Sequence, residues 1–143
     1  MRTVREILNK KGNLIWSVSP EATVFDALQV MAEKEAGAVL VIDNGNVKGI
    51  LSERDYARKV VLHGKFSKDT KVVDIMSDKV IYVEPAQSIE ECMALMINKK
   101  IRHLPVIENN KLSGIISIGD VVEAVLEEKD TVIGELTRFI QGS

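Results

Sequence analysis

Residues 49–55 read Gly-Ile-Leu-Ser-Glu-Arg-Asp, and residues 114–120 read Gly-Ile-Ile-Ser-Ile-Gly-Asp. The two tracts are 65 positions apart, and the match extends outward from them at the same offset. Residues 16–60 align with residues 81–125 without a gap and share 12 identities. A match of this length at a fixed offset indicates a tandem duplication. Every element expected in the first copy is therefore expected again in the second.

The segment upstream of each copy is duplicated as well. Residues 4–8 resemble residues 72–76 at an offset of 68. The first copy therefore carries three extra residues, which we place around residues 9–14.

Each copy is predicted to fold as β-α-β-β-α. A short extended piece at residues 15–18, or 80–83, precedes a proline, and a helix with apolar residues at helical spacing follows. Thr23 or Ser88 caps the start of that helix, and an acid three residues later completes a capping box. Two strands joined by turn residues come next, and a second helix begins after the serine of the duplicated tract. The strands are expected at residues 39–42 with 47–51 and at residues 104–107 with 112–116.

One copy of roughly 55–60 residues is a marginal core by itself. We therefore expect an α+β (mixed α/β) fold in which the two repeats pack about a pseudo-two-fold axis. Repeat 1 is placed at residues 4–62 and repeat 2 at residues 72–126. Apolar residues at helical spacing then predict a C-terminal amphipathic helix or tail at residues 127–143.

Composition excludes several classes of protein. The chain has 143 residues, a formal net charge of −2 and no continuous basic stripe, which argues against nucleic-acid binding. No apolar run is long enough to span a bilayer, and the start lacks the apolar core of a signal peptide, so no membrane partner is expected. Cys92 is the single cysteine, which rules out an internal disulfide and favours the cytoplasm.

No catalytic constellation stands out in the sequence. The two histidines have no metal-ligand partner at the usual spacing, and no phosphate-binding glycine loop occurs. Cys92 falls on the apolar stripe of its helix and is interpreted as a core residue. We therefore predict neither an enzyme nor a metal site.

The duplicated tract itself has two interpretations. Ser52 with Asp55, and Ser117 with Asp120, have the spacing of a capping box that only stabilises a helix start. That interpretation does not explain why a glycine precedes the serine in both copies. The alternative is a phosphate or ribose site, because a helix start offers free N–H groups and the aspartate accepts hydrogen bonds. Residue spacing leaves both interpretations open.

With this tract in both copies, and with Arg102-His103-Leu104-Pro105-Val106 before the last hairpin, the chain resembles a CBS domain pair, or Bateman module, of the stand-alone bacterial or archaeal kind. The resemblance spans about residues 4–126. It implies a regulatory or sensor module without catalytic activity, which binds an adenine nucleotide in clefts between the repeats. AMP is the ligand expected first, with ADP, ATP, NAD or S-adenosylmethionine as alternatives, and no catalytic cofactor is expected.

The resemblance also implies a set of ligand-binding residues. Asp55 and Asp120 would hold ribose hydroxyls, while Ser52 and Ser117 would contact ribose or phosphate. The other implied residues offer backbone groups, a hydroxyl, apolar walls or neighbouring positions at the helix start: Ser17, Val18, Thr23, Ala38, Val39, Tyr82, Val83, Leu104, Pro105, Ile118 and Gly119.

Charge differs between the two copies. Arg54 in the first copy aligns with Gly119, and Gly37-Ala38 aligns with Arg102-His103. Arginine is suited to phosphate oxygens, so we expect two unequal sites whose phosphate end is held by Arg54, Arg102 and His103. The alternative is that Arg102 lies at the surface and His103 is an interior ring without a ligand role.

Two further expectations concern partners. Because CBS pairs commonly dimerise, the resemblance implies a homodimer, and a chain without an output domain implies an unknown regulated protein partner. The competing hypothesis is a ligand-independent interaction module that regulates a partner protein. The identity of the nucleotide is not encoded in any motif that we find.

Overall fold

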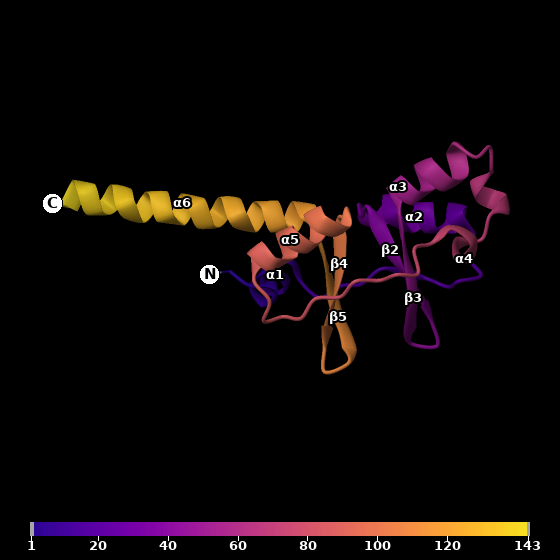
Figure 1. Cartoon of the computed structure of the whole chain (residues 1–143), viewed down its shortest axis with the longest axis horizontal. Helices are drawn as coiled ribbons and strands as arrows, with labels where there is room; N and C mark the ends of the chain where they lie inside the picture. Colours follow the sequence, from indigo (N-terminus) through magenta and orange to yellow (C-terminus); the bar gives the residue numbers. More distant parts are fainter. Residues whose placement is uncertain (1, 143) are drawn as a thin grey trace. The chain divides into compact units, whose positions relative to one another are not determined.

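The structure is a computed structural model that describes residues 2–142, and it divides into two compact units (Figure 1). Unit 1 consists of the N-terminal segment up to Leu14 together with the chain from Ile81 onward. Unit 2 is the uninterrupted segment Ile15–Val80. Both units combine helices with a small sheet, which confirms the predicted α+β class.

Unit 2 contains a three-stranded sheet in the order β1-β2-β3. Strand β1 is parallel to β2, and β2 is antiparallel to β3. The elements in chain order are β1 (Ser17–Val18), α2 (Val24–Lys34), β2 (Ala38–Asp43), β3 (Asn46–Ser52), α3 (Glu53–Tyr56), the π-helical turn η1 (Ala57–Val61), the 3-10 turn η2 (Ser67–Asp69) and α4 (Val72–Ile75).

Unit 1 repeats this plan with a two-stranded antiparallel sheet. Its elements are α1 (Val4–Lys11), α5 (Ile89–Lys99), β4 (His103–Glu108), β5 (Lys111–Ser117) and α6 (Ile118–Gly142). Each repeat of the sequence opens with a short helix, and this helix packs with the remainder of the other repeat. Helix α1, which opens repeat 1, is in unit 1, and α4, which opens repeat 2, is in unit 2.

One predicted strand is nearly absent. Residues 80–83 are the counterpart of β1, but only Val83 forms a bridge, to Val106. In unit 2 the backbone N–H of Leu40 donates to the carbonyl of Trp16. The equivalent of Leu40 in unit 1 is Pro105, which has no N–H to donate. The second copy therefore loses a hydrogen bond that holds β1 on the sheet.

The hairpin turns follow from the residues at their tips. Asn44 and Gly45 in the first copy, and Asn109 and Asn110 in the second, all have positive φ angles between 51° and 79°. Positive φ at both central residues is the geometry of the type I′ hairpin, which Asn and Gly tolerate best. The predicted hairpins are therefore confirmed.

The predicted capping boxes form at three of four helix starts. Thr23 with Asp26, Ser52 with Asp55, and Ser117 with Asp120 each make both reciprocal hydrogen bonds. At α5 the hydroxyl of Ser88 accepts from the N–H of Glu91, but the Glu91 carboxylate accepts from the Gln87 side chain instead. The box at α5 is therefore only half formed.

Each unit has its own apolar core. Core residues of unit 2 come from α2, β2, β3, η1 and α4, and those of unit 1 come from α1, α5, β4, β5 and α6. Cys92 is completely buried in unit 1, and burial raises the pKa of its thiol to about 11. Its predicted role as a core residue is confirmed.

The glycine at the head of each duplicated tract has a packing role. A Cβ on Gly49 would lie 2.6 Å from the Ser77 carbonyl oxygen, and a Cβ on Gly114 would lie 2.7 Å from Leu8 Cδ2. Both neighbours belong to the segment at or just after the short helix, α4 or α1, that packs on the strand. This close approach is a structural reason for a glycine in both copies.

Helix α6 is a single element from Ile118 to Gly142, so the second helix of repeat 2 and the expected C-terminal helix are continuous. Its C-terminal half extends past α1 and α5, the other helices of its unit (Figure 1). Within residues 2–142 the structure has no helix that is both long enough and apolar enough to cross a membrane.

Candidate ligand-binding site

One candidate site lies in unit 2, where β3 ends and α3 begins. Asp55 Oδ2 accepts from the Ser52 N–H at 3.0 Å and from Ser52 Oγ at 3.0 Å. The Ser52 hydroxyl in turn accepts from the Asp55 N–H at 3.1 Å. The other carboxylate oxygen, Oδ1, lies 3.3 Å from the Lys59 ammonium. The carboxylate is thus held in one orientation by the helix start and is charge-compensated by a lysine.

A second candidate site, in unit 1, has the same arrangement where β5 passes into α6. Asp120 Oδ2 accepts from the Ser117 N–H at 2.8 Å, and the Asp120 N–H donates to Ser117 Oγ at 3.2 Å. The Lys11 ammonium donates to the same Oδ2 at 2.7 Å. The Asp55 and Asp120 side chains are 19% and 21% exposed, so both carboxylates are reachable without being fully hydrated.

The two lysines are functional candidates that sequence reasoning missed. Lys59 also donates to the Ile75 carbonyl, and Lys11 also donates to the Ile115 carbonyl, so each bridges an aspartate and a backbone oxygen. The i,i+4 spacing of Asp55 and Lys59 could have indicated their pairing. No spacing links Lys11 to Asp120, because Lys11 is brought there by α1.

The helix starts at both sites are tied back to the strand entrances. The Glu53 N–H donates to the Gly37 carbonyl, and the Ile118 N–H donates to the Arg102 carbonyl. Gly37 and Arg102 are equivalent positions in the two repeats. The residues before β2 and β4 are therefore held beside the first turn of α3 and α6.

The expected apolar wall residues divide between two strand faces. Val39 and Leu104 are completely buried and belong to the cores of their own units. Because side chains alternate along a strand, Ala38 and Pro105 point to the opposite face of β2 and β4. Ala38 and Pro105 are buried as well, so the strand faces alone do not select which of the four side chains would contact a ligand.

The expected backbone edge is also unequal in the two units. Ser17 and Val18 pair with Leu40 and Val41 as β1, whereas Tyr82 has no strand partner and Val83 is buried. Partial burial raises the pKa of the Tyr82 hydroxyl. The Thr23 hydroxyl accepts from the Asp26 N–H at the start of α2, so its lone pairs are partly used by capping.

The expected phosphate-binding cations differ in exposure. Arg54 and Arg102 are exposed, as is Gly119, while Ile118 and His103 are half-buried. Burial lowers the pKa of His103, the nearby Lys11 lowers it further, and Asp120 partly opposes the shift. The neutral imidazole is therefore favoured, with one ring nitrogen able to donate and the other to accept.

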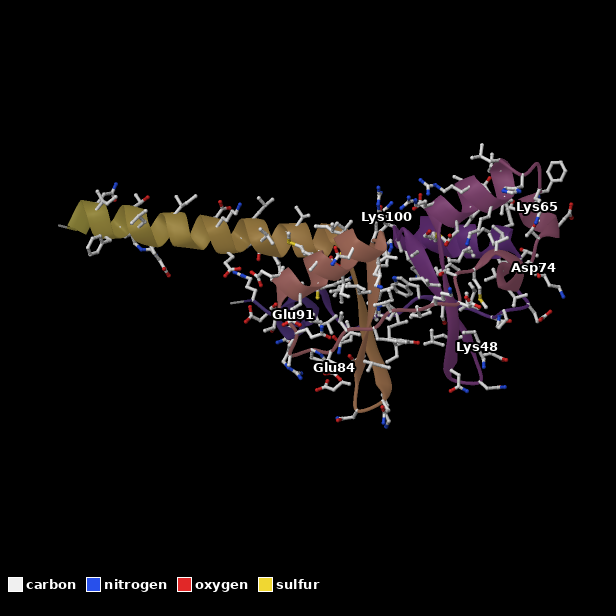
Figure 2. All side chains as sticks on the ribbon, viewed as in Figure 1. Lys48, Lys65, Asp74, Glu84, Glu91 and Lys100 are labelled. Atoms are coloured by element: carbon white, nitrogen blue, oxygen red, sulfur yellow. The ribbon has the colours of Figure 1, made fainter. Side chains whose placement is uncertain are left out.

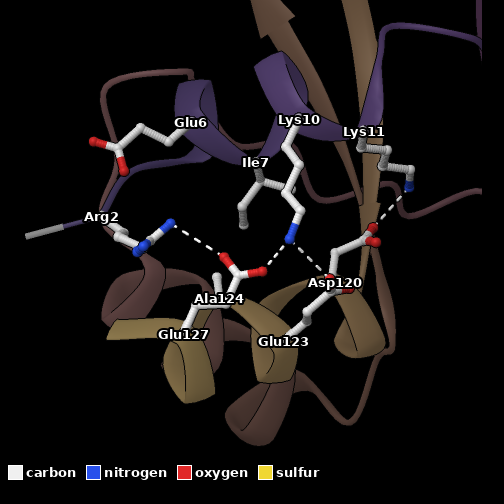
Figure 3. Close-up of a pocket in the computed structure, with 9 residues that line it drawn as sticks. All are labelled: Arg2, Glu6, Ile7, Lys10, Lys11, Asp120, Glu123, Ala124 and Glu127. Atoms are coloured by element: carbon white, nitrogen blue, oxygen red, sulfur yellow. Dashed lines mark hydrogen bonds and ion pairs between the residues drawn. The ribbon is translucent and has the colours of Figure 1, made fainter. Parts of the chain in front are cut away.

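A pocket of about 300 Å³ opens between α1 and the first turns of α6 (Figure 3). Its lining residues are mostly charged: Arg2, Glu6, Ile7, Lys10, Lys11, Asp120, Glu123, Ala124 and Glu127. Lys10 bonds to Glu123 and Glu127, Arg2 bonds to Glu127, and Lys11 bonds to Asp120. The pocket thus reaches one predicted site residue, Asp120, but most of the charged side chains that line it are paired with each other.

No group of three or more His, Cys, Asp or Glu side chains that could hold a metal ion occurs within residues 2–142. The site residues offer hydrogen bonds and charge to a ligand. Each site has a carboxylate, a serine hydroxyl and a neighbouring cation, which suit a ligand that carries both hydroxyl groups and negative charge.

Two segments of the sequence, residues 4–62 and residues 72–127, match the CBS domain. The chain belongs to the CBS-domain family. It is a CBS domain pair, and proteins with CBS domains are generally regulatory modules rather than enzymes.

Solved structures and curated proteins agree with this assignment. A CBS-domain protein from Burkholderia ambifaria is 51% identical, with a TM-score of 0.86 over 88% of this CBS domain pair and 95% of that chain. The mitochondrial CBS domain-containing protein CBSX3 of Arabidopsis thaliana is 38% identical over 98% of this chain and 72% of its own length. The crystal structure of CBSX2 in complex with AMP is 29% identical, with a TM-score of 0.70 over 90% of this chain and 99% of that chain.

Because one of these CBS relatives is mitochondrial by name, the cytoplasmic location stays a prediction for this chain.

Proposed function

We propose that this CBS domain pair is a regulatory module that binds an adenine nucleotide, with AMP as the first candidate, and that it performs no catalysis. The observation that carries the proposal is the duplicated Ser–Asp arrangement at the starts of α3 and α6. In each copy the carboxylate of one aspartate accepts a hydrogen bond from the serine N–H and forms an ion pair with a lysine.

Ribose recognition is the use of these residues that their chemistry supports best. A carboxylate accepts hydrogen bonds from two neighbouring hydroxyl groups, and charge-assisted hydrogen bonds are stronger than neutral ones. Lys11 and Lys59 form ion pairs with Asp120 and Asp55 and so bring positive charge to each site. The exposed guanidinium groups of Arg54 and Arg102 add donors suited to phosphate oxygens. The AMP complex of the similar protein CBSX2 supports the choice of ligand.

The test is calorimetric titration of nucleotide-stripped protein with AMP, ADP, ATP, NAD and S-adenosylmethionine. We compare the wild type with Asp55→Asn and Asp120→Asn, since asparagine keeps an oxygen that can accept from the serine N–H. Asp26→Asn is the matched control, because Asp26 makes the same kind of capping box at the start of α2.

Each site variant is expected to bind AMP more weakly by about one to two orders of magnitude, the equivalent of a lost charge-assisted hydrogen bond. The control is expected to bind as the wild type does. Equal affinity in both site variants would contradict the assignment of the aspartates. No binding of any of the five ligands by the folded wild type would favour the ligand-independent interaction module instead.

A further inference from the structure

Helix α6 carries an exposed apolar stripe that the proposed function does not use. Its members are 47–64% exposed: Val122, Leu126, Ile133, Leu136 and Ile140. They recur at alternating spacings of four and three residues once Lys129 is included, which is the heptad pattern of a helix that pairs with another helix. Phe139 borders the stripe and is 75% exposed.

The stripe continues beyond the contacts that hold α6 in unit 1. The buried residues of α6 are Val121 and Ala124, near its start, and the ion pairs to α1 end at Glu127. The C-terminal half of α6 extends past α1 and α5, with side chains projecting along its length (Figure 2). The CBS-domain match also ends at residue 127, so this part of the helix lies outside the matched domain.

We propose that this stripe pairs with the same stripe on a second copy of the chain, with the two α6 helices antiparallel. In that arrangement Val122 lies opposite Ile140, Leu126 opposite Leu136, and Lys129 opposite Ile133. The two outer layers are therefore apolar on both sides, and Lys129 meets Ile133 in the layers between them, in a register that a two-fold symmetric interface allows.

Charge favours the antiparallel orientation. A parallel pair would place the two Lys129 side chains in one layer, where like charges repel. The antiparallel pair separates them, and each Lys129 comes within about one helical turn of Asp130 in the second copy. The aliphatic stem of Lys129 then packs on Ile133 while its ammonium reaches the carboxylate.

A second copy fits the stripe better than a membrane surface does. Helices that lie on anionic membranes carry lysine and arginine on their polar face. After residue 122, α6 carries Glu123, Glu127, Glu128, Asp130 and Glu135 against Lys129 and Arg138. The polar side of this helix is therefore acidic and would be repelled by anionic lipid.

The first experiment measures the mass of the full chain by sedimentation equilibrium. A range of concentrations is needed because the stripe is fewer than three heptads long and the pairing is expected to be weak. The seam variant is Ile133→Glu combined with Leu136→Glu. The control is Arg138→Glu, which changes the net charge by the same two units on the opposite side of the same helical turns. Circular dichroism checks that all three proteins keep the same helix content.

We expect the wild type and the Arg138→Glu control to have the same mass and the seam variant to have half of it. Equal masses for all three proteins would overturn the proposal, and so would a wild type that stays monomeric or cosediments with anionic vesicles. AMP titration of the same proteins separates this proposal from the proposed function, because the seam variant is expected to bind AMP as the wild type does.

Disulfide cross-linking tests the orientation. Leu126→Cys and Leu136→Cys are made separately, and Cys92 does not interfere because it is buried. The antiparallel pair predicts a cross-linked dimer when the two variants are mixed and oxidised, and none from either variant alone. Cross-linking of each variant with itself would overturn the antiparallel arrangement.

Discussion

His103 and His63 differ in their surroundings, although both are lone histidines in the sequence. His63 is exposed, whereas His103 is half-buried at the start of β4. Burial lowers the pKa of His103 from its usual 6.5, the cations Lys11 and Arg102 lower it further, and Asp120 opposes them. The folded protein therefore holds a proton on His103 less readily than the unfolded chain does.

This difference predicts a pH dependence of stability. A histidine with a depressed folded pKa contributes stability above its unfolded pKa, and that contribution is lost as pH falls below about 6.5. For the ligand-free protein, we expect the thermal unfolding midpoint to decrease as the pH is lowered from about 7.5 to about 5.5. His103→Gln should reduce this fall and His63→Gln should not. Equal pH profiles for the two variants, measured by thermal denaturation, would contradict the role assigned to His103.

Residue patterns predicted the capping bonds of Asp55 and Asp120 well, because a capping box has a fixed local spacing. Asp55 and Asp120 both form the reciprocal bonds that their spacing to serine requires. Lys11 could not be predicted, because it reaches Asp120 through the packing of α1 and not through sequence spacing. The assignment of all these residues to a nucleotide remains a prediction.

At the scale of elements, the paired glycines Gly49 and Gly114 are not equivalent. A Cβ at Gly49 would meet the backbone carbonyl of Ser77, which cannot move without disturbing its antiparallel bridge to Ile50. A Cβ at Gly114 would meet the end of the Leu8 side chain, which can change its rotamer. The same substitution therefore has different consequences in the two repeats.

We expect Gly49→Ala to lower the free energy of unfolding by about 1–3 kcal/mol, the usual range for overpacking. Gly114→Ala should cost distinctly less. Urea denaturation of the two variants and the wild type measures the difference. A cost for Gly114→Ala equal to or larger than that for Gly49→Ala would show that the packing of α1 and α4 on the strands has been misjudged.

The hairpins and helix starts were predictable because short-range chemistry decides them. Asn44-Gly45 and Asn109-Asn110 select the turn, and Thr23, Ser52 and Ser117 select the helix starts. The missing counterpart of β1 was not predicted, because the missing N–H of Pro105 matters only once a neighbouring strand is in place. Likewise, the polar residues after Leu126 do not interrupt α6, since charged residues continue a helix as well as apolar ones do.

At the scale of the whole chain, the two repeats of the sequence do not coincide with the two compact units. The N-terminal helix α1 packs on β5, more than a hundred residues later, through Leu8 and Gly114. The α4 helix makes the equivalent contact within unit 2. The duplication was readable from the sequence, but the assignment of α1 to unit 1 depends on long-range packing that no local pattern encodes.

This assignment predicts where a mutation in α1 acts. Leu8 is 5% exposed and Leu14 is 69% exposed, so Leu14→Ala is a matched control for Leu8→Ala. We expect Leu8→Ala to cost about 2–4 kcal/mol and Leu14→Ala almost nothing. Hydrogen exchange should show lost protection in β4 and β5 before β2 and β3. Loss confined to β2 and β3 would contradict the division into units.

The position of α1 also has a consequence for synthesis on the ribosome. Helix α1 leaves the exit tunnel before unit 2 does, but it finds its partner strand only when residues 111–117 have been translated. Unit 2 is complete in the nascent chain as soon as Val80 emerges, because none of its residues comes from later in the sequence. Translation therefore completes unit 2 before unit 1, and α1 has no partner strand until the second half of the chain has been made.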